Sequence, residues 1–473
     1  MTVSLELPVA VIGAGPVGLA AAAHLVGCGL RPLVLERGSR VGASLLEWAH
    51  VRVFSPWRHN IDPAARALLE KSDWTAPRED GLPNGGEIVR QYLEPLAAVP
   101  EIARNLVLGA TVTAIAREGR SKVSSFDREN APFIVRYEDA GGVEHRVRAR
   151  AVIDASGTWT QPNPIGVDGL PVPGEKRSNR IAYGIPDVVG AERSSYLGKR
   201  VLVIGGGHSA INVALALMEL QQEEPGTEIF WALRQPSIDR LLGGGLNDEL
   251  PERGALGLAA KRAMEDRRLR MLAPFAVQEI VETAHGLQVG ALLARRPFEL
   301  HVDRIVVATG FRPDLSFLRE LRVELDPVVE APPKLAPLID PNVHSCGTVP
   351  PHGIDELAHP EPDFTIVGSK SYGRAPTFLM LTGYEQVRSV VAAIAGDHAA
   401  ARSVQLVLPE TGVCGVSLPV DVAARGEGCC GGPAPAAVDA CCAADAVAKQ
   451  EGKAGCGCGT AKATHSEAME PAE

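Results

Sequence analysis

One supersecondary pattern occurs twice in this chain, and it constrains the fold more than any other feature. In each copy a short apolar run leads into a glycine-rich turn, then an alanine- and leucine-rich stretch, then a second apolar run. The first copy extends from Pro8 to Glu36 and the second from Arg200 to Arg234. This order is typical of a strand, a crossover helix and a parallel strand. The repetition therefore predicts an α/β fold built on two parallel sheets.

The first turn has the spacing Gly-x-Gly-x-x-Gly, at Gly13, Gly15 and Gly18. Gly13 allows a tight turn, Gly15 lets the backbone approach a pyrophosphate, and Gly18 lets the helix pack closely on the strand. Glu36 ends the second apolar run, where an acidic side chain accepts hydrogen bonds from a ribose 2′-hydroxyl. The turn predicts a Rossmann-like domain that binds FAD. A plain strand–helix–strand unit with a glycine turn is the alternative.

The second turn has Gly205 and Gly207, with Ser209 and then Ala210 in the third fingerprint position, which tolerates alanine. Its second apolar run is followed by Arg234 rather than by an acid. The planar guanidinium suits the 2′-phosphate of NADPH. The sequence therefore predicts a second Rossmann-like domain that binds NADPH. A solvated loop charge is the alternative reading of Arg234.

The composition is that of a globular protein, with 45% hydrophobic and 22% charged residues. The formal net charge of -10 disfavours a general affinity for nucleic acid or for anionic membranes. The apolar stretch from Val9 to Leu30 has no preceding Lys or Arg and is interrupted by glycines and a proline. It predicts neither a signal peptide nor a membrane span, and we expect a cytoplasmic protein.

The cysteines are concentrated near the end of the chain. Six of the nine occur as close pairs: Cys429, Cys430, Cys441, Cys442, Cys456 and Cys458. Such pairs can present two thiolates to a soft centre such as copper(I), mercury(II), or trivalent arsenic or antimony. The spacing fits structural zinc less well. The alternative is compositional drift in an Ala/Gly-rich segment.

The ordered motifs resemble those of flavoproteins with two dinucleotide-binding domains. They are most similar to flavin-containing monooxygenases and their arsenic-operon relatives, over about residues 8–396. The resemblance implies that the NADPH domain is inserted in the FAD domain. It also implies that Gly42, Gly157 and Gly368 lie against FAD, and that the helix Thr377–Gln386 covers the isoalloxazine side.

The chain departs from these families in two ways. The stretch Ile181–Asp187 has no histidine where the monooxygenases carry a Phe-x-Gly…His motif. Neither Gly38–Trp57 nor Gly205–Gly310 contains a cysteine, so the flavin-side disulfide of the related reductases is missing.

Four segments are expected: the first part of the FAD domain at 1–165, the NADPH domain at 166–308, the returning FAD segment at 309–412, and a flexible tail at 413–473. Within them we expect a helix from Glu87 to Ala98, one strand from Leu106 to Ala116, and antiparallel strands that include Val143 to Ile153. A last helix is expected from Thr377 to Ala395.

The sequence thus predicts an NADPH-dependent FAD monooxygenase-like oxidoreductase. Oxygen and a soft substrate such as trivalent arsenic or antimony are its expected partners, with a role in arsenic resistance. Two alternatives stay open: a metal or disulfide reductase that uses the tail thiols, and a non-enzymatic metalloid carrier or sensor. No side chain stands out as a catalytic acid or base, and the oligomeric state is open.

Overall fold

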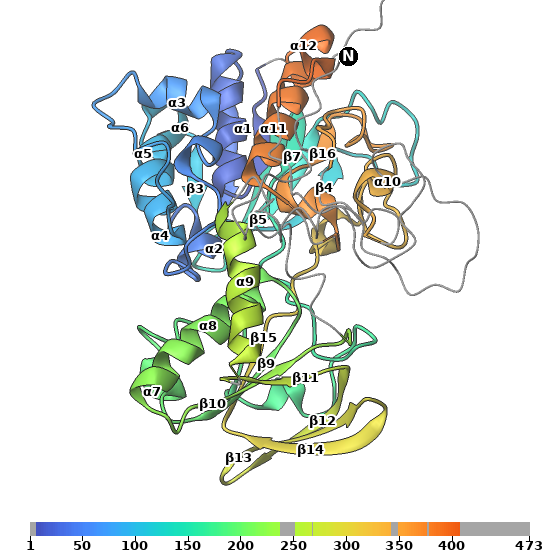
Figure 1. Ribbon diagram of the computed structural model, residues 1–473. Helices are drawn as coiled ribbons and strands as arrows, with labels where there is room; N and C mark the ends of the chain where they lie inside the picture. Colours follow the sequence, from blue (N-terminus) through green and yellow to red (C-terminus); the bar gives the residue numbers. More distant parts are fainter. Residues whose placement is uncertain (1–5, 237–250, 267, 342–348, 376–377, 407–473) are drawn as a thin grey trace, which may run out of the picture.

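The computed structural model describes residues 6–236, 251–266, 268–341, 349–375 and 378–406 (Figure 1). The predicted tail and its six paired cysteines lie outside the described residues, as do Cys346 and Cys414. Within the described part of the chain, no helix has the length and apolar character needed to cross a bilayer.

The first domain is built on a five-stranded parallel sheet in the order β16-β7-β1-β2-β3. Its strands are β1 (Val9–Ile12), β2 (Pro32–Glu36), β3 (Leu106–Leu108), β7 (Ala151–Asp154) and β16 (Phe364–Ile366). The crossover helix α1 (Pro16–Gly27) starts with proline, which suits a first helical position, and its run of buried alanines lets it lie close to the sheet. This is the unit that the first glycine turn predicts.

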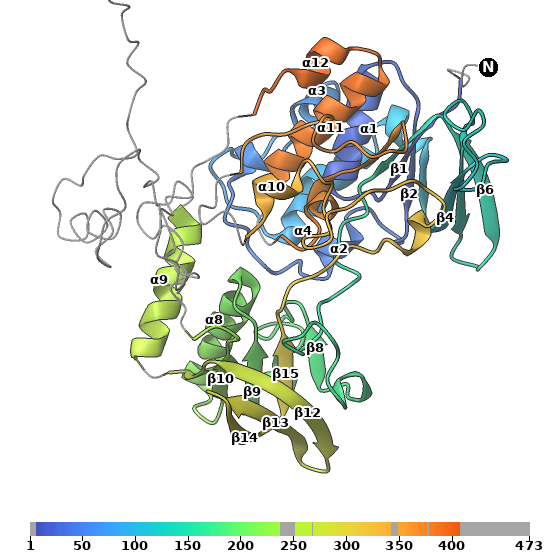
Figure 2. The ribbon, with the colours of Figure 1, turned by 90° about the vertical axis from the view of Figure 1, so that its right-hand side faces the viewer.

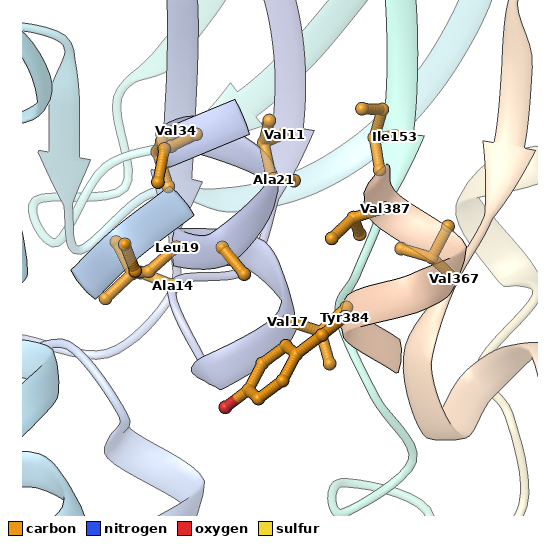
Figure 3. Packing of buried hydrophobic residues seen from close by; sticks show 14 of the residues in the cluster. Val11, Ala14, Val17, Leu19, Ala21, Val34, Ile153, Val367, Tyr384 and Val387 are labelled. Carbon is orange, nitrogen blue, oxygen red and sulfur yellow. The ribbon is translucent and has the colours of Figure 1, made fainter. Parts of the chain in front are cut away.

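The helix α11 (Met380–Ile394) packs directly on α1, although the two are far apart in sequence (Figure 3). A Cβ on Gly383 would lie only 2.6 Å from Val17 Cγ2, so a glycine in α11 allows this close approach. Figure 3 also shows Tyr384 of α11 beside Val17, within the same buried cluster. The returning segment therefore completes the core of the first domain.

Shorter elements cover the rest of this domain. The helices are α2 (Ala43–Leu46), α3 (Pro63–Leu69), α4 (Gly85–Ile88), α5 (Glu94–Ala97), α6 (Pro100–Ala103), α10 (Ala336–Ile339) and α12 (His398–Arg402). Single turns are η1 (Trp57–His59), the π-turn η2 (Val89–Leu93), η6 (Ser316–Leu318) and η7 (Gly368–Tyr372). The helix expected from Glu87 to Ala98 is thus the continuous stretch α4–η2–α5, with a π-turn in its middle.

The second domain repeats the arrangement, with a parallel sheet in the order β11-β10-β9-β15-β8. Its strands are β8 (Ile181–Tyr183), β9 (Arg200–Ile204), β10 (Glu228–Ala232), β11 (Arg270–Leu272) and β15 (Arg304–Val307). Its helical elements are η3 (Glu175–Arg177), α7 (Arg193–Tyr196), α8 (His208–Glu223) and α9 (Pro251–Glu265).

Each domain also carries a three-stranded antiparallel sheet (Figures 1 and 2). The first contains β4 (Thr111–Arg117), β5 (Phe133–Glu138) and β6 (Glu144–Ala149), and the second contains β12 (Phe275–Thr283), β13 (Gly286–Leu293) and β14 (Arg296–Val302). All strands of the second domain lie in sequence between β7 and β16, which are neighbours in the first sheet. The predicted fold, two Rossmann-like domains with one inserted in the other, is confirmed.

Two strand predictions are wrong. The single strand expected from Leu106 to Ala116 is divided at Gly109, whose φ of 69° turns the chain, so β3 and β4 belong to different sheets. The antiparallel run expected from Val143 to Ile153 ends at Ala149. Its last part, β7, instead joins the parallel sheet beside β1.

Candidate functional site

In the first glycine turn, the fold itself requires glycine at two positions but not at the third. Gly13 has a φ of 98°, and a Cβ there would lie 2.8 Å from the carbonyl oxygen of Ala155. A Cβ on Gly18 would lie 2.0 Å from the carbonyl oxygen of Gly13. A Cβ on Gly15 would meet nothing within 4 Å. The backbone at Gly15 therefore faces open space at the start of α1, as a pyrophosphate site requires.

Glu36 is buried beside this turn and fixes its shape. Its Oε2 accepts a hydrogen bond from the amide of Ala14 at 2.6 Å, and its Oε1 accepts one from the amide of Gly38 at 2.7 Å. Each carboxylate oxygen can accept a second hydrogen bond, so a ribose hydroxyl can still be bound. The sequence analysis missed this backbone role, and the contact with the sugar stays a prediction.

The other glycines assigned to FAD have left-handed backbone conformations and lie at chain turns. Gly42 has a φ of 63° and donates a hydrogen bond to the carbonyl of Ala14, which brings it to the first turn. Gly157 and Gly368, with φ of 69° and 71°, follow the adjacent strands β7 and β16. Because carboxyl ends of parallel strands share one edge, these segments meet where open α/β sheets bind ligands.

A buried ion pair joins the ends of β7 and β16. Lys370 Nζ lies 2.7 Å from Asp154 Oδ2, and both side chains are completely buried. The ammonium also donates to Ser156 Oγ at 3.1 Å, and Ser156 Oγ in turn donates to Asp154 Oδ1 at 2.6 Å. The contact fixes the chain just before Gly157. Sequence analysis missed it, because nothing local links Lys370 to Asp154.

A second buried network links Gly368 to α11. Gln386 Oε1 accepts a hydrogen bond from the amide of Gly368 at 2.7 Å, and Gln386 Nε2 donates to Ser371 Oγ and to His352 Nε2, each at 2.9 Å. Since His352 Nε2 accepts, its Nδ1 carries the proton and donates to Pro350 O. Burial lowers the pKa of His352, consistent with a neutral imidazole.

The second turn repeats the geometry of the first. Gly205 has a φ of 144°, and a Cβ there would lie 2.2 Å from the carbonyl oxygen of Ala308. A Cβ on Gly207 would meet nothing within 4 Å. Ser209 and the buried Ala210 lie in the first turn of α8, which thus begins at an open backbone surface. Arg234 is exposed just beyond β10, whose carboxyl end lies beside that of β9.

Contacts between the domains occur close to this turn. The ring of Phe54, in the first domain, lies 5.5 Å from the ring of His208, which directly follows Gly207. Trp159 and Phe311, on the two connections between the domains, stack with centroids 4.4 Å apart. Trp159 Nε1 also donates to Glu47 Oε2 at 2.6 Å. The first domain therefore touches the predicted NADPH turn.

The model of the pyridine nucleotide-disulphide oxidoreductase family matches residues 10–345, which include both glycine turns. The chain belongs to this family. The prediction of an oxidoreductase that uses FAD and NADPH is confirmed by this membership and by its relatives. The closer resemblance to arsenic-operon proteins stays a prediction.

The relatives of this pyridine nucleotide-disulphide oxidoreductase include monooxygenases and disulfide reductases. A flavin-containing monooxygenase of Aspergillus flavus is 26% identical over 45% of this chain and 51% of its own length, so the chain spans about half of that relative. Bacilliredoxin reductase of Bacillus subtilis is 26% identical over 67% of this chain and 80% of its own. The bacillithiol disulfide reductase structure from Bacillus cereus has a TM-score of 0.61 and 21% identity, and covers 82% of this chain and 99% of that one.

The described residues of this family member contain one cysteine, Cys28. It lies just after α1, at the opposite end from Gly15. Since α1 has 12 residues, it separates the two by about 18 Å. Within the described part of the chain, no cysteine pair therefore adjoins the glycine turns that would hold the cofactors.

We expect Arg234→Ala to weaken NADPH binding and to leave NADH binding nearly unchanged. Loss of a charge-assisted hydrogen bond to the 2′-phosphate costs on the order of 1.5–3 kcal/mol, which is about 10- to 150-fold in KM. Steady-state kinetics with both nucleotides measure the change. Arg296→Ala, which removes another exposed arginine, on β14, is the control. If Arg234→Ala keeps the wild-type preference for NADPH over NADH, Arg234 is only a surface charge.

Proposed function

We propose that this chain is a cytoplasmic NADPH-dependent FAD monooxygenase-like enzyme that oxidises a soft trivalent centre, such as arsenite or antimonite, in metalloid resistance. The observation that carries the proposal is the lack of a cysteine pair beside the glycine turns within the described residues. Without such a pair beside the turns, oxygen is the acceptor of the electrons from NADPH, and the trivalent substrate is itself oxidised by the same oxygen molecule. The cysteine pairs at 429–458 supply soft ligands that collect the substrate.

The proposed reaction consumes one arsenite, one oxygen molecule, one NADPH and one proton, and yields arsenate, water and NADP⁺. One oxygen atom joins arsenic, which loses two electrons, and the other becomes water with the hydride of NADPH and the proton. FAD, when bound, passes electrons from NADPH to oxygen. The protein contributes binding, orientation and exclusion of solvent.

A second candidate is a disulfide or metal reductase that passes electrons to the tail thiols. The likeness to bacilliredoxin reductase and the paired cysteines favour it. We do not propose the carrier or sensor alternative, because both nucleotide turns are complete.

Truncation after Val413 distinguishes the two candidates. The oxygenase predicts that flavin reduction by NADPH persists, that arsenite-dependent NADPH oxidation falls at low arsenite, and that high arsenite partly restores it. The reductase predicts loss of turnover at every concentration, because the thiols would accept the electrons. A full-length variant with the six paired cysteines replaced by serine controls for chain length. Absence of arsenate in the wild-type reaction would contradict the oxygenase.

A further inference from the structure

A small pocket lies at the first turn of α11, the helix expected to cover the isoalloxazine side. It is lined by Ser55, His59, Leu379, Met380 and Leu381, and its volume of about 10 Å³ suits one water-sized group. The Nδ1 atom of His59 is buried and has no hydrogen-bond partner. Buried polar atoms normally have a hydrogen-bond partner, so we expect this nitrogen to bind a group that enters the pocket.

His59 is held in place by a buried polar scaffold. The adjacent Asn60 is completely buried, and its side chain donates to the carbonyl oxygens of Ser55 and Pro56 at 2.7 and 3.0 Å. The hydroxyl of Tyr384, on α11, donates to the carbonyl of Asn60 at 2.7 Å. The segment that carries His59 is therefore tied to the helix that forms the other wall of the pocket.

The same segment lies between the predicted NADPH turn and the first turn of α11. At one end Phe54 contacts His208, beside the open backbone of Gly207. At the other end His59 faces the start of α11. Gly383, one turn into α11, packs on Val17, which lies two residues after Gly15. The pocket at the first turn of α11 is therefore at the same end of α1 as the open turn predicted to hold FAD.

The charge around His59 favours a neutral imidazole. Burial and the neighbouring Arg58 lower its pKa. The pocket residues contributed by α11, Leu379 to Leu381, carry no ionisable group. At neutral pH the imidazole is therefore uncharged, and in the tautomer with its proton on Nε2 the Nδ1 atom can accept a proton from the pocket.

We propose that His59 is the catalytic proton carrier on the substrate side of this enzyme. This rests on the proposed function, whose reaction consumes one proton. His59 Nδ1 accepts that proton from solvent through the pocket and gives it to the oxygen atom that leaves as water. The imidazole is neutral again after each turnover. The step therefore uses only the one proton that the overall reaction consumes.

The test compares His59→Gln with His359→Gln. His359 also has a buried ring nitrogen without a partner and a pKa lowered by burial, but its ring packs against Phe364 of β16 and does not line the pocket. General acid–base catalysis is typically worth about 10²–10⁴-fold. We expect arsenite-dependent turnover of His59→Gln to fall at least about 100-fold. Anaerobic flavin reduction by NADPH should stay within a factor of about two, since hydride transfer to FAD needs no proton carrier. His359→Gln should match wild type in both.

A second readout needs no substrate. The visible spectrum of the oxidised FAD-bound protein is titrated below neutral pH, where His59 gains its charge. Wild type and His359→Gln should show a spectral step that His59→Gln lacks. An unchanged step in His59→Gln, or wild-type turnover in that variant, overturns the proposal. If wild type makes no arsenate but the step still depends on His59, the proposed oxidation fails while the placement of His59 beside the flavin stands.

Discussion

Replacing Gly15 with valine is expected to remove FAD from the protein without unfolding it. A Cβ at Gly15 meets no protein atom within 4 Å, so the fold tolerates the side chain. The same side chain would occupy the surface that a pyrophosphate must approach. Overpacking of this kind costs about 1–3 kcal/mol, which weakens FAD binding roughly 5- to 150-fold. The ratio of flavin to protein absorbance after purification measures the loss.

Two other glycines of this helix provide matched controls. Gly27→Val places the same side chain in α1, again with no atom within 4 Å, but at the far end from the turn. It should retain FAD. Gly18→Val should unfold the domain instead, because its Cβ would lie 2.0 Å from the carbonyl oxygen of Gly13. Full FAD content in a folded Gly15→Val protein would contradict the assignment of the first turn.

The parts of the fold that local sequence determines were predictable. The strand–turn–helix–strand units around Gly13 and Gly205 have the expected order, because apolar periodicity and glycine spacing are local signals. Sheet membership is not a local property. β7 follows β6 after one residue and yet pairs with β1 and β16, so its apolar run alone could not separate it from the antiparallel strands.

In the candidate site, too, only the residues with a local sequence signal were predictable. Gly15 and Gly207 were assigned from their spacing, and both face open space as expected, whereas Gly42 and Gly368 were assigned only through family resemblance. His59, Gln386 and Lys370 were missed, because each depends on partners from distant segments. A lysine four residues after the end of a buried strand is the one local hint, since lysine is almost never fully buried unless paired.

Lys370→Met is expected to destabilise the first domain strongly and to lower its affinity for FAD. The change leaves the completely buried Asp154 carboxylate without its ionic partner. Breaking a buried ion pair on one side costs about 3–5 kcal/mol, because the remaining charge is uncompensated. The released strand end carries Ser156 and Gly157, at the sheet edge where FAD is predicted to bind. Urea denaturation of the FAD-free protein measures the stability, and flavin fluorescence measures FAD binding.

The double variant Lys370→Met/Asp154→Leu separates charge from packing. Replacing both partners with apolar residues removes the stranded carboxylate, and such exchanges are often neutral for stability. We therefore expect most of the lost stability to return. FAD affinity should stay low, because Ser156 then has neither Asp154 nor Lys370 to hold it. Arg117→Met, which breaks the buried pair with Glu361 in the same domain, should cost stability without changing FAD affinity in the folded protein. Equal losses of FAD affinity in Arg117→Met and Lys370→Met would show that Lys370 acts through stability alone.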